Sequence, residues 1–141
     1  MPLLQVNSSF NFKLNTSLDL NLIFIYLLSC SLTVFQTYLD ACKKTGLLVT
    51  SVVSTIDLIN CKQIKLQITG SCPTISVDKS DALELYVSKE SLGVEVFSAK
   101  SSGVNVLFEE KEEWVEKAVC EQFKTVIKGG ELVSVAVEHK G

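Results

Sequence analysis

Between residues 37 and 112 the chain reads, in successive blocks of 19 residues, TYLDACKKTGLLVTSVVST, IDLINCKQIKLQITGSCPT, ISVDKSDALELYVSKESLG and VEVFSAKSSGVNVLFEEKE. The blocks share apolar residues at their first, third, eleventh and thirteenth positions, with Thr37 as the exception. A small residue recurs at the sixth position, as Cys42, Cys61, Ser80 and Ala99. A repeat of about 20 residues is typical of a solenoid, in which successive repeats stack on one another.

Apolar residues alternate with polar ones inside each block, as in Ile64, Leu66 and Ile68. This alternation is the period of a β-strand whose successive side chains point to opposite faces. Polar breaks with glycine or proline, such as residues 69–73, separate the strands. We therefore expect an all-β fold in which each block forms one coil of a β-helix, with equivalent strands about 4.8 Å apart.

The outward positions of the blocks carry charges that the stacking would align. One column contains Lys43, Lys62, Asp81 and Lys100, and another pairs Lys65 with Glu84. Opposite charges on adjacent strands stabilise a sheet by about 0.2–1 kcal/mol per pair. Two interpretations remain: a solvated face, or a flat binding platform.

The C-terminal part leaves the repeat. Residues 109–116 are acidic and predict a loop or a short helical turn. Phe123–Ile127 and Leu132–Val137 flank Gly129-Gly130, a sequence typical of a β-hairpin. Because the end of a β-helix is an open edge and a two-stranded hairpin is marginally stable alone, the hairpin must dock on its own coils or on those of a second copy.

Residues 1–36 form an atypical, apolar N-terminal segment, and we place the start of the β-helix domain (37–141) at Thr37. Three hypotheses account for the apolar run at 18–35: a membrane anchor, a degenerate first coil, or a segment foreign to the domain. The run is shorter than the ~20 residues that a membrane-spanning helix needs. Strand-forming Ile, Phe, Tyr and Val favour the coil.

The composition excludes several classes of function. The 141 residues fit one domain, and the net charge of −3 with no basic block argues against nucleic-acid binding. All 13 cationic residues are lysines, so arginine chemistry is absent. The five cysteines are widely spaced and the chain has one histidine, which argues against zinc. We interpret the cysteines as buried and reduced, with a disulfide or a reactive thiol as the alternatives.

A search for catalytic groups finds no active site. His139 lies in a polar tail with no nucleophile near it in sequence, and Lys128-Gly129-Gly130 lacks the spacing of a phosphate-binding loop. Asp57, Ser76 and Glu95 are expected in one outward column, where the serine separates the carboxylates. We therefore predict a protein that is not an enzyme and that needs no cofactor and no metal.

Several segments carry a family resemblance. They are residues 39–47 (LDACKKTGL), 59–62 (INCK), 73–81 (PTISVDKSD), 86–92 (YVSKESL), 98–106 (SAKSSGVNV) and 121–125 (EQFKT). From about Leu39 to Gly141 the chain closely resembles the C-terminal domain of cyclase-associated proteins, which bind actin monomers. Residues 1–35 match nothing in that family.

The resemblance implies a right-handed parallel β-helix that dimerises by exchanging a C-terminal hairpin, here 123–137. It also implies binding to ADP-loaded monomeric actin, faster exchange of that ADP for ATP, a role in filament turnover, and a cytoplasmic, cytoskeleton-associated location. Adenylyl cyclase is a further partner that the family name suggests.

The resemblance also implies functional residues, which we assign to this chain position by position. Those assigned to actin binding are Asn60, Lys62, Lys65, Gln67, Lys79, Asp81, Lys89, Ser91, Lys100, Ser101 and Ser102, with Glu138, His139 and Lys140 of the tail. Those assigned to the dimer hairpin are Phe123, Thr125, Ile127, Leu132, Val133, Val135 and Val137.

An alternative function is that of the related tubulin-folding cofactor C domains, which are β-helices that act on small GTPases. Their mechanism uses a catalytic arginine to stabilise charge in the transition state. Because this chain has no arginine, the alternative reduces to a β-helix interaction scaffold without GTPase-activating activity. A further alternative is a membrane-tethered interaction domain in which residues 18–35 form the anchor.

Overall fold

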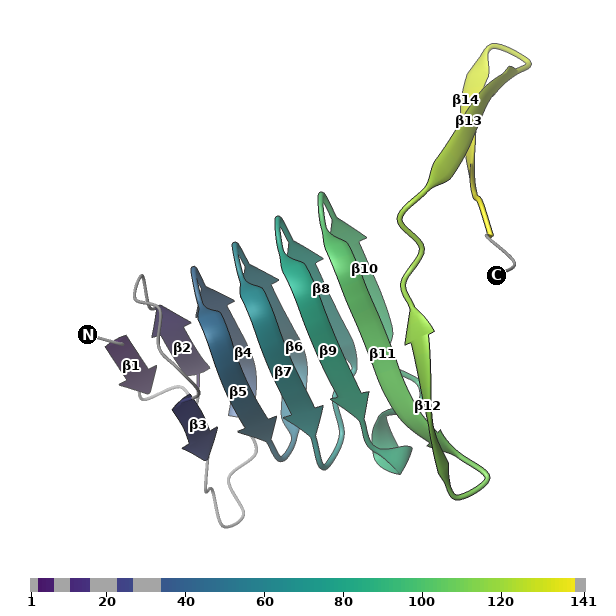
Figure 1. Ribbon diagram of the computed structural model, residues 1–141. Coiled ribbons are helices and arrows are strands. Elements are labelled where there is room, and N and C mark those ends of the chain that lie inside the picture. The colour runs from purple at the N-terminus through teal and green to yellow at the C-terminus, as the bar shows by residue number, and fades with distance from the viewer. Residues whose placement is uncertain (1–2, 7–10, 16–22, 27–33, 139–141) are drawn as a thin grey trace.

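The computed structural model describes residues 3–6, 11–15, 23–26 and 34–138, with side chains from residue 36 onward. Its described elements are strands and a single 3-10 turn, η1 (Lys89–Ser91). The strands form a flattened solenoid of stacked coils with a hairpin that projects from its C-terminal end (Figure 1). The predicted all-β parallel β-helix with a C-terminal β-hairpin is therefore confirmed.

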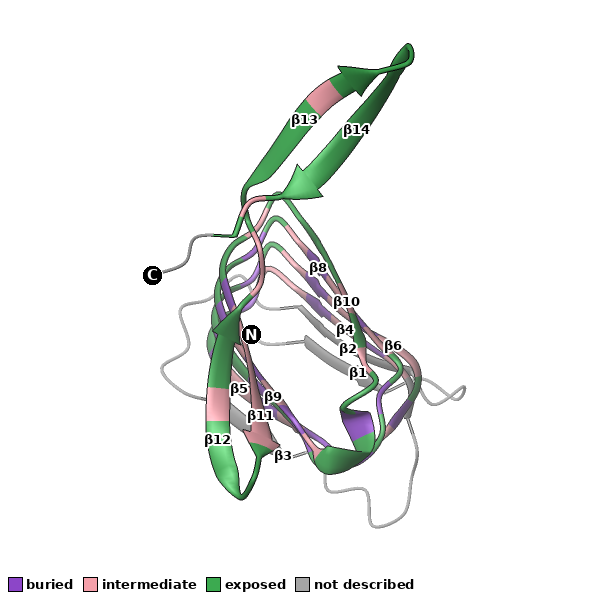
Figure 2. Ribbon diagram, turned by 90° about the vertical axis from the view of Figure 1, so that its right-hand side faces the viewer, coloured by how far each residue is buried: buried purple, intermediate pink, exposed green. Residues whose placement is uncertain are grey.

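Two sheets face each other across the core (Figure 2). The first sheet runs in the order β1 (Leu3–Val6), β2 (Asn11–Asn15), β4 (Val34–Asp40), β6 (Val52–Ile59), β8 (Thr74–Asp78), β10 (Glu95–Ala99). The second runs in the order β12 (Glu113–Ala118), β11 (Ser102–Glu110), β9 (Asp81–Val87), β7 (Lys62–Ile68), β5 (Lys43–Val49), β3 (Ile23–Tyr26). Neighbouring strands of different coils are parallel, so each coil contributes one strand to each sheet.

Alternate side chains of both sheets fill the space between them. Strand β7 shows the pattern most clearly, because Ile64, Leu66 and Ile68 are buried while the residues between them are exposed. Leu39, Leu58 and Val77 are stacked in the facing sheet. The predicted columns are thus confirmed through Val87, and their burial is the main favourable term in folding.

The last coil departs from the predicted register. Val96 lies beside Ile75, and Val104 and Val106 lie beside Leu83 and Leu85, so this step is 21 residues and not 19. The connection at 88–94, which contains η1, is two residues longer than the connection at 69–73. The placement of Val94 over Ile75 was therefore wrong, as was that of Glu95 in the column of Asp57, because Phe97 takes that position.

The acidic segment at 109–116 is also different from its prediction. It forms the end of β11 and the start of β12, joined by a tight turn at Lys111 and Glu112 with φ of 51° and 67°. Strand β12 pairs antiparallel with β11 and extends the second sheet beyond the last coil. The predicted loop or helical turn is therefore a second β-hairpin.

The described strands of the N-terminal segment continue the stack. Strand β2 pairs parallel with β4, β3 pairs parallel with β5, and β1 pairs antiparallel with β2. This arrangement agrees with the hypothesis of an additional coil. Among the described residues, no helix is long and apolar enough to cross a membrane. The domain boundary at Thr37 stays a prediction.

The C-terminal hairpin consists of β13 (Phe123–Lys128) and β14 (Glu131–Ala136). Gly129 and Gly130 both have positive φ, as a two-residue hairpin turn requires. The hairpin stands away from the coils (Figures 1 and 2), and all of β14 is exposed. The most exposed apolar side chains are Ile127 at 78% and Leu132 at 74%.

Candidate functional site

The two-residue turns that lead from the first sheet to the second are the most regular surface feature of the coils. They lie at residues 41–42, 60–61, 79–80 and 100–101, along the upper side of Figure 1. The first residue of each turn is left-handed, with φ between 49° and 54° at Ala41, Asn60, Lys79 and Lys100. None of these is glycine, so the stack imposes a conformation that costs an L-residue roughly 1–2 kcal/mol.

Hydrogen bonds between coils hold this conformation. The amides of Asn60 and Lys79 donate to the carbonyls of Asp78 and Ala99 at 3.1 Å. Just after the turn, the amides of Lys62 and Asp81 donate to Cys42 and Cys61 at 2.9 Å. Backbone hydrogen bonds between coils therefore continue on both sides of the second turn residue, whose own amide donates to a side-chain hydroxyl at Cys61 and Ser80.

A column of small side chains completes the turns from inside. Ser80 Oγ accepts from the amide of Cys61 at 3.1 Å and donates to the carbonyl of Asp78 at 2.9 Å. Ser101 Oγ repeats both contacts one coil later, with the Ser80 amide and the Ala99 carbonyl. The fourth member of the predicted column is therefore Ser101 and not Ala99, in keeping with the 21-residue step.

This geometry brings seven of the predicted actin-binding residues together. They lie in three adjacent columns of the turns, together with Cys61 and Ser80. We name these columns the turn edge: Asn60, Lys79 and Lys100, then Cys61, Ser80 and Ser101, then Lys62, Asp81 and Ser102. Asn60, Lys62 and Lys79 are exposed. Ser102 Oγ donates to Asp81 Oδ1 at 2.7 Å and orients that carboxylate. Lys100 lies beside Lys79, not beside Asp81 as the 19-residue repeat predicted.

Two more predicted residues lie on the outer face of the second sheet. Lys65 pairs with Glu84 at 3.7 Å, as their shared column predicted, and Gln67 lies one column further along β7. The Lys65 side chain is largely exposed, so this ion pair contributes little to stability.

The outer face of the first sheet has the opposite character. Its strands β4, β6, β8 and β10 contain no lysine, and Asp40, Asp57, Asp78 and Glu95 point outward from them. Gln36 Nε2 donates to Asp57 Oδ2 at 2.7 Å. Partial burial, followed by the charges of Asp40 and Asp57, raises the pKa of Tyr38. From β4 onward, the lysines of the described coils therefore lie in the turns, on the second sheet and, as Lys89, in η1.

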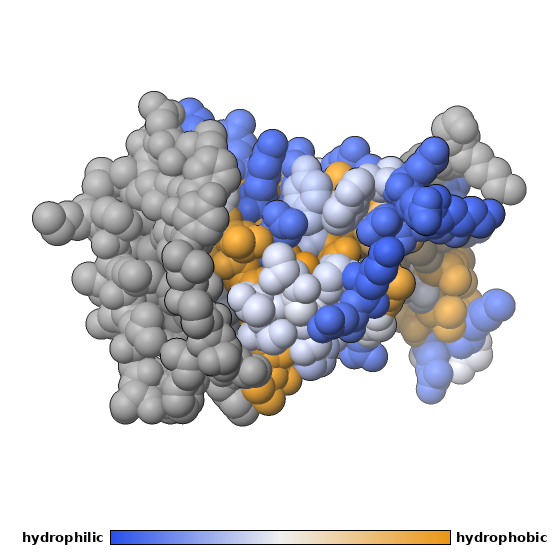
Figure 3. All heavy atoms as spheres, turned by 90° about the horizontal axis from the view of Figure 1, so that it is seen from below, coloured by the Kyte–Doolittle hydropathy of each residue, from blue (hydrophilic) through white to orange (hydrophobic). Residues whose placement is uncertain are grey.

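Lys89 and Ser91 lie apart from the turn edge, in η1 at the opposite ends of the strands. Ser91 is 2% exposed, and its hydroxyl donates to the carbonyl of Gly70. Ser91 therefore holds the loop in place and does not lie on a surface that a partner can contact. Seen from this side, the molecule mixes hydrophilic and hydrophobic patches (Figure 3).

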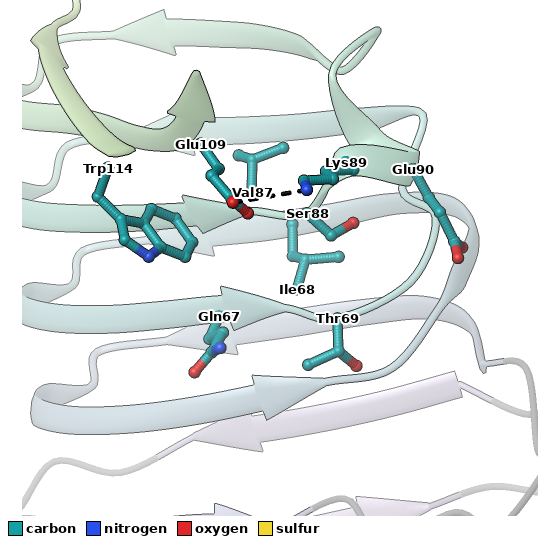
Figure 4. Close-up of a pocket in the computed structure, with 9 residues that line it drawn as sticks. All are labelled: Gln67, Ile68, Thr69, Val87, Ser88, Lys89, Glu90, Glu109 and Trp114. Carbon is teal, nitrogen blue, oxygen red and sulfur yellow. Dashed lines mark ion pairs between the residues drawn. The ribbon is translucent and has the colours of Figure 1, made fainter. Parts of the chain in front are cut away.

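A pocket at this end contains functional candidates that sequence reasoning did not assemble. Its wall combines Trp114 of β12 and Glu109 of β11 with Lys89 and Gln67 (Figure 4). Trp114 is 56% exposed and makes an edge-to-face contact with Tyr86, with ring centroids 5.8 Å apart. The sequence alone could not indicate the pocket, because Trp114 reaches it only through the β11–β12 hairpin, which the sequence analysis did not predict.

The remaining predicted residues belong to the C-terminal part. Glu138 is exposed, whereas His139 and Lys140 lie outside the described residues. The hairpin register separates the predicted dimer residues onto two faces, with Phe123, Thr125, Ile127 and Leu132 on one face and Val133 and Val135 on the other. Val137 closes the base of the hairpin through its amide, which donates to Gln122 at 2.8 Å.

The cysteines described by the structure are free thiols. Cys42, Cys61 and Cys72 are buried, which agrees with the interpretation of small, reduced core residues. A hydrogen bond with the Cys42 thiol lowers the pKa of Cys61 against the opposing effect of burial, and burial raises the pKa of Cys72. Within the described residues, no group of three or more His, Cys, Asp or Glu side chains could hold a metal ion.

Comparison with known proteins gives a consistent assignment. The family described as "Adenylate cyclase associated (CAP) C terminal" matches residues 28–139. The expectation that residues 1–35 match nothing in the family was therefore wrong for residues 28–35. Adenylyl cyclase-associated protein of Dictyostelium discoideum is 39% identical over 104 residues, and adenylyl cyclase-associated protein 1 of Homo sapiens is 46% identical over 103 residues. Each alignment covers 72% of this chain and 22% of the relative.

A solved structure agrees with the sequence matches. The crystal structure of cyclase-associated protein from Cryptosporidium parvum superposes with a TM-score of 0.77 at 31% identity, and the alignment covers 97% of this chain and 96% of the other. The fold thus defines a parallel β-helix of the cyclase-associated type. The chain belongs to the adenylyl cyclase-associated protein family and corresponds to its C-terminal domain.

We expect replacement of Ser80 by alanine to destabilise the turn edge. The change leaves the buried amide of Cys61 without its acceptor, which costs about 1–3 kcal/mol of unfolding free energy. Ser80→Cys is the matched control, because cysteine already occupies this column at positions 42 and 61, and it should cost less than half as much. Urea unfolding measures both variants. Equal stability of Ser80→Ala and the parent chain would contradict this account of the turns.

Proposed function

We propose that this chain binds ADP-loaded monomeric actin through the turn edge and the adjoining outer face of the second sheet. The observation that supports the proposal is the alignment of Asn60, Lys62, Lys79 and Lys100 on one rigid edge. The resemblance to the family had assigned these four residues to actin binding, and the chain belongs to that family. Ladder hydrogen bonds fix the backbone of the edge before binding, so little ordering cost remains for its main chain.

The lysines of this edge suit a surface that recognises a protein partner. Lysine is a flexible, strongly hydrated point charge, which steers association and tolerates small differences in geometry. The turn edge carries Lys62, Lys79 and Lys100 against one carboxylate, Asp81, which gives this edge a cationic character. The proposed occupant therefore presents carboxylates to the turn edge.

Acceleration of nucleotide exchange requires more than binding. A ligand shifts a conformational equilibrium only by its differential affinity for the two states. We propose that the turn edge binds actin more tightly in the conformation from which ADP leaves, and that the chain itself performs no chemistry. Filament turnover and association with adenylyl cyclase concern the full-length relatives, of which this chain spans about a fifth.

We propose in addition that the chain is a homodimer in which each protomer receives the hairpin of the other. Among the described residues, β10 ends the first sheet while the second continues through β11 and β12, so β10 has an edge without a strand partner. The exposed hairpin offers two strands with apolar side chains on both faces. Pairing the two would close the open edge and bury Ile127 and Leu132.

The test of the actin proposal is the rate at which labelled nucleotide leaves ADP-actin. The purified chain should accelerate exchange, and Lys62→Ala with Lys79→Ala should together reduce the effect roughly tenfold, from about 0.7 kcal/mol for each lost charge contact. Lys111→Ala is the matched control, because Lys111 has the same left-handed φ as Lys79 but lies in the β11–β12 turn.

An unchanged exchange rate with the folded parent chain would contradict the actin proposal. So would an equal loss in the Lys111 variant, since that result would show a general effect of charge and not a contact at the turn edge.

The dimer proposal is tested by mass in solution. Sedimentation equilibrium of the parent chain should give twice the mass of the 15.5 kDa polypeptide. Ile127→Lys combined with Leu132→Lys should give the monomer, because burying two lysines without partners opposes association. Lys124→Ala with Glu131→Ala is a control on the other face of the hairpin. A monomeric parent chain, or a dimer that persists in the double lysine variant, would contradict hairpin exchange.

A further inference from the structure

The pocket beside Trp114 has the size and shape to receive one side chain of a partner. It encloses about 330 Å³ on the outer face of the second sheet, near the ends of β7, β9 and β11. This volume is at the lower end of the range for small-ligand sites. Figure 4 shows the indole of Trp114 on one side and Lys89 on the other, with Gln67 and Thr69 below.

Trp114 forms an aromatic wall that packs against Tyr86. The ring meets Tyr86 at an angle of 69°, and the Tyr86 hydroxyl donates to Glu84 at 3.0 Å. More than half of the tryptophan surface is nevertheless exposed. An indole face that is held in place and open to solvent is a strong binding partner for a cation.

The chain already places a cation in this pocket. The ammonium of Lys89 lies 3.5 Å from Glu109 Oε1, and Glu109 lies directly beside Trp114 in the β11–β12 pair. The two side chains are 70% and 30% exposed, so the ion pair is weak and a competing cation can displace Lys89 at low cost.

The surroundings favour a positive charge. By the strand register, Glu109 and Glu116 lie on the same face of the β11–β12 pair as Trp114, and Glu84 lies on the same face of β9. The hydrogen bond to Glu84, partial burial, and the charges of Glu84 and Glu116 together raise the pKa of Tyr86. The carboxylates Glu84, Glu109 and Glu116 therefore surround Trp114 on this part of the outer face.

The geometry also favours a polypeptide over a free amine. Strand β12 is the last strand of the second sheet among the described residues, so its outer edge can pair with an extended segment. Trp114 belongs to that strand and lines the pocket. A segment that lies along β12 would place a side chain beside Trp114, with Glu109 on the next strand inward.

We propose that this pocket binds the lysine or arginine side chain of an extended segment of a partner protein. The cation stacks on the Trp114 indole and pairs with Glu109 in place of Lys89, which moves into solvent. The pocket lies at the opposite end of β7 from the turn edge, where Gln67 and Lys62 are about 16 Å apart. It shares Gln67 and Lys89 with the residues predicted for actin binding, but its tests use peptides without actin, so their outcome is independent of the actin proposal.

Trp114 is the one tryptophan of the chain, so its fluorescence reports directly on the pocket. We would titrate the full chain with the acetylated, amidated peptides Thr-Arg-Thr and Thr-Lys-Thr. Both peptides should give a saturable change in Trp114 fluorescence, and their binding should weaken at high salt. The same peptide with acetyl-lysine or glutamate at its centre should give none. No saturable change with the cationic peptides, or an equal change with the glutamate peptide, would overturn the proposal.

Two substitutions test the assignment with opposite signs. Glu109→Gln should weaken binding of the arginine peptide roughly threefold to tenfold, whereas Glu95→Gln, the same change on the other sheet, should leave it unchanged. Lys89→Met removes the internal competitor and should strengthen binding about threefold. Isothermal titration calorimetry measures the affinity of all three variants for the peptide without relying on Trp114 fluorescence. Weaker binding of the arginine peptide by the Lys89 variant would show that Lys89 does not compete with the peptide and would overturn the proposal.

Discussion

The backbone ladder that joins one coil to the next is the constraint on which the structure depends. It runs along both sheets and also through the turns between them, where the Ser102 amide donates to Ser80 at 3.0 Å as its equivalents do one and two coils earlier. Each coil must therefore repeat the path of the coil before it, including the left-handed residue of each turn. The same repetition aligns the core side chains and the exposed lysines, so that the surface columns follow from the stacking.

The sequence predicts the strands because alternation and repetition act together. A buried position such as Leu66 has apolar equivalents in the coils on either side, and Lys65 and Glu84 meet as their spacing requires. The two-residue insertion at 88–94 escaped prediction for a physical reason. A shift of two preserves which side chains point inward, so Val94 and Val96 fit the pattern equally well.

Other features have no signal in the sequence. Lys79 and Lys100 are left-handed because the ladder imposes this conformation, which lysine does not favour and which its presence in the sequence does not indicate. Ser91 resembles a surface residue, but its hydroxyl satisfies the Gly70 carbonyl beneath η1. The pocket required the β11–β12 hairpin to bring Glu109 beside Trp114. Features that depend on one coil repeating another were predictable, whereas those that depend on a departure from the repeat were not.

The central claim is that the stacked turns present one actin-binding edge. Carboxyl-activated cross-linking of the chain to ADP-actin, followed by mass spectrometry, tests it most directly, because every cation of the chain is a lysine. The account predicts cross-links from Lys62, Lys79 and Lys100. Cross-links confined to Lys111, Lys117 and Lys124, with the turn lysines unmodified, would contradict it and would move the contact to the β11–β12 and β13–β14 hairpins.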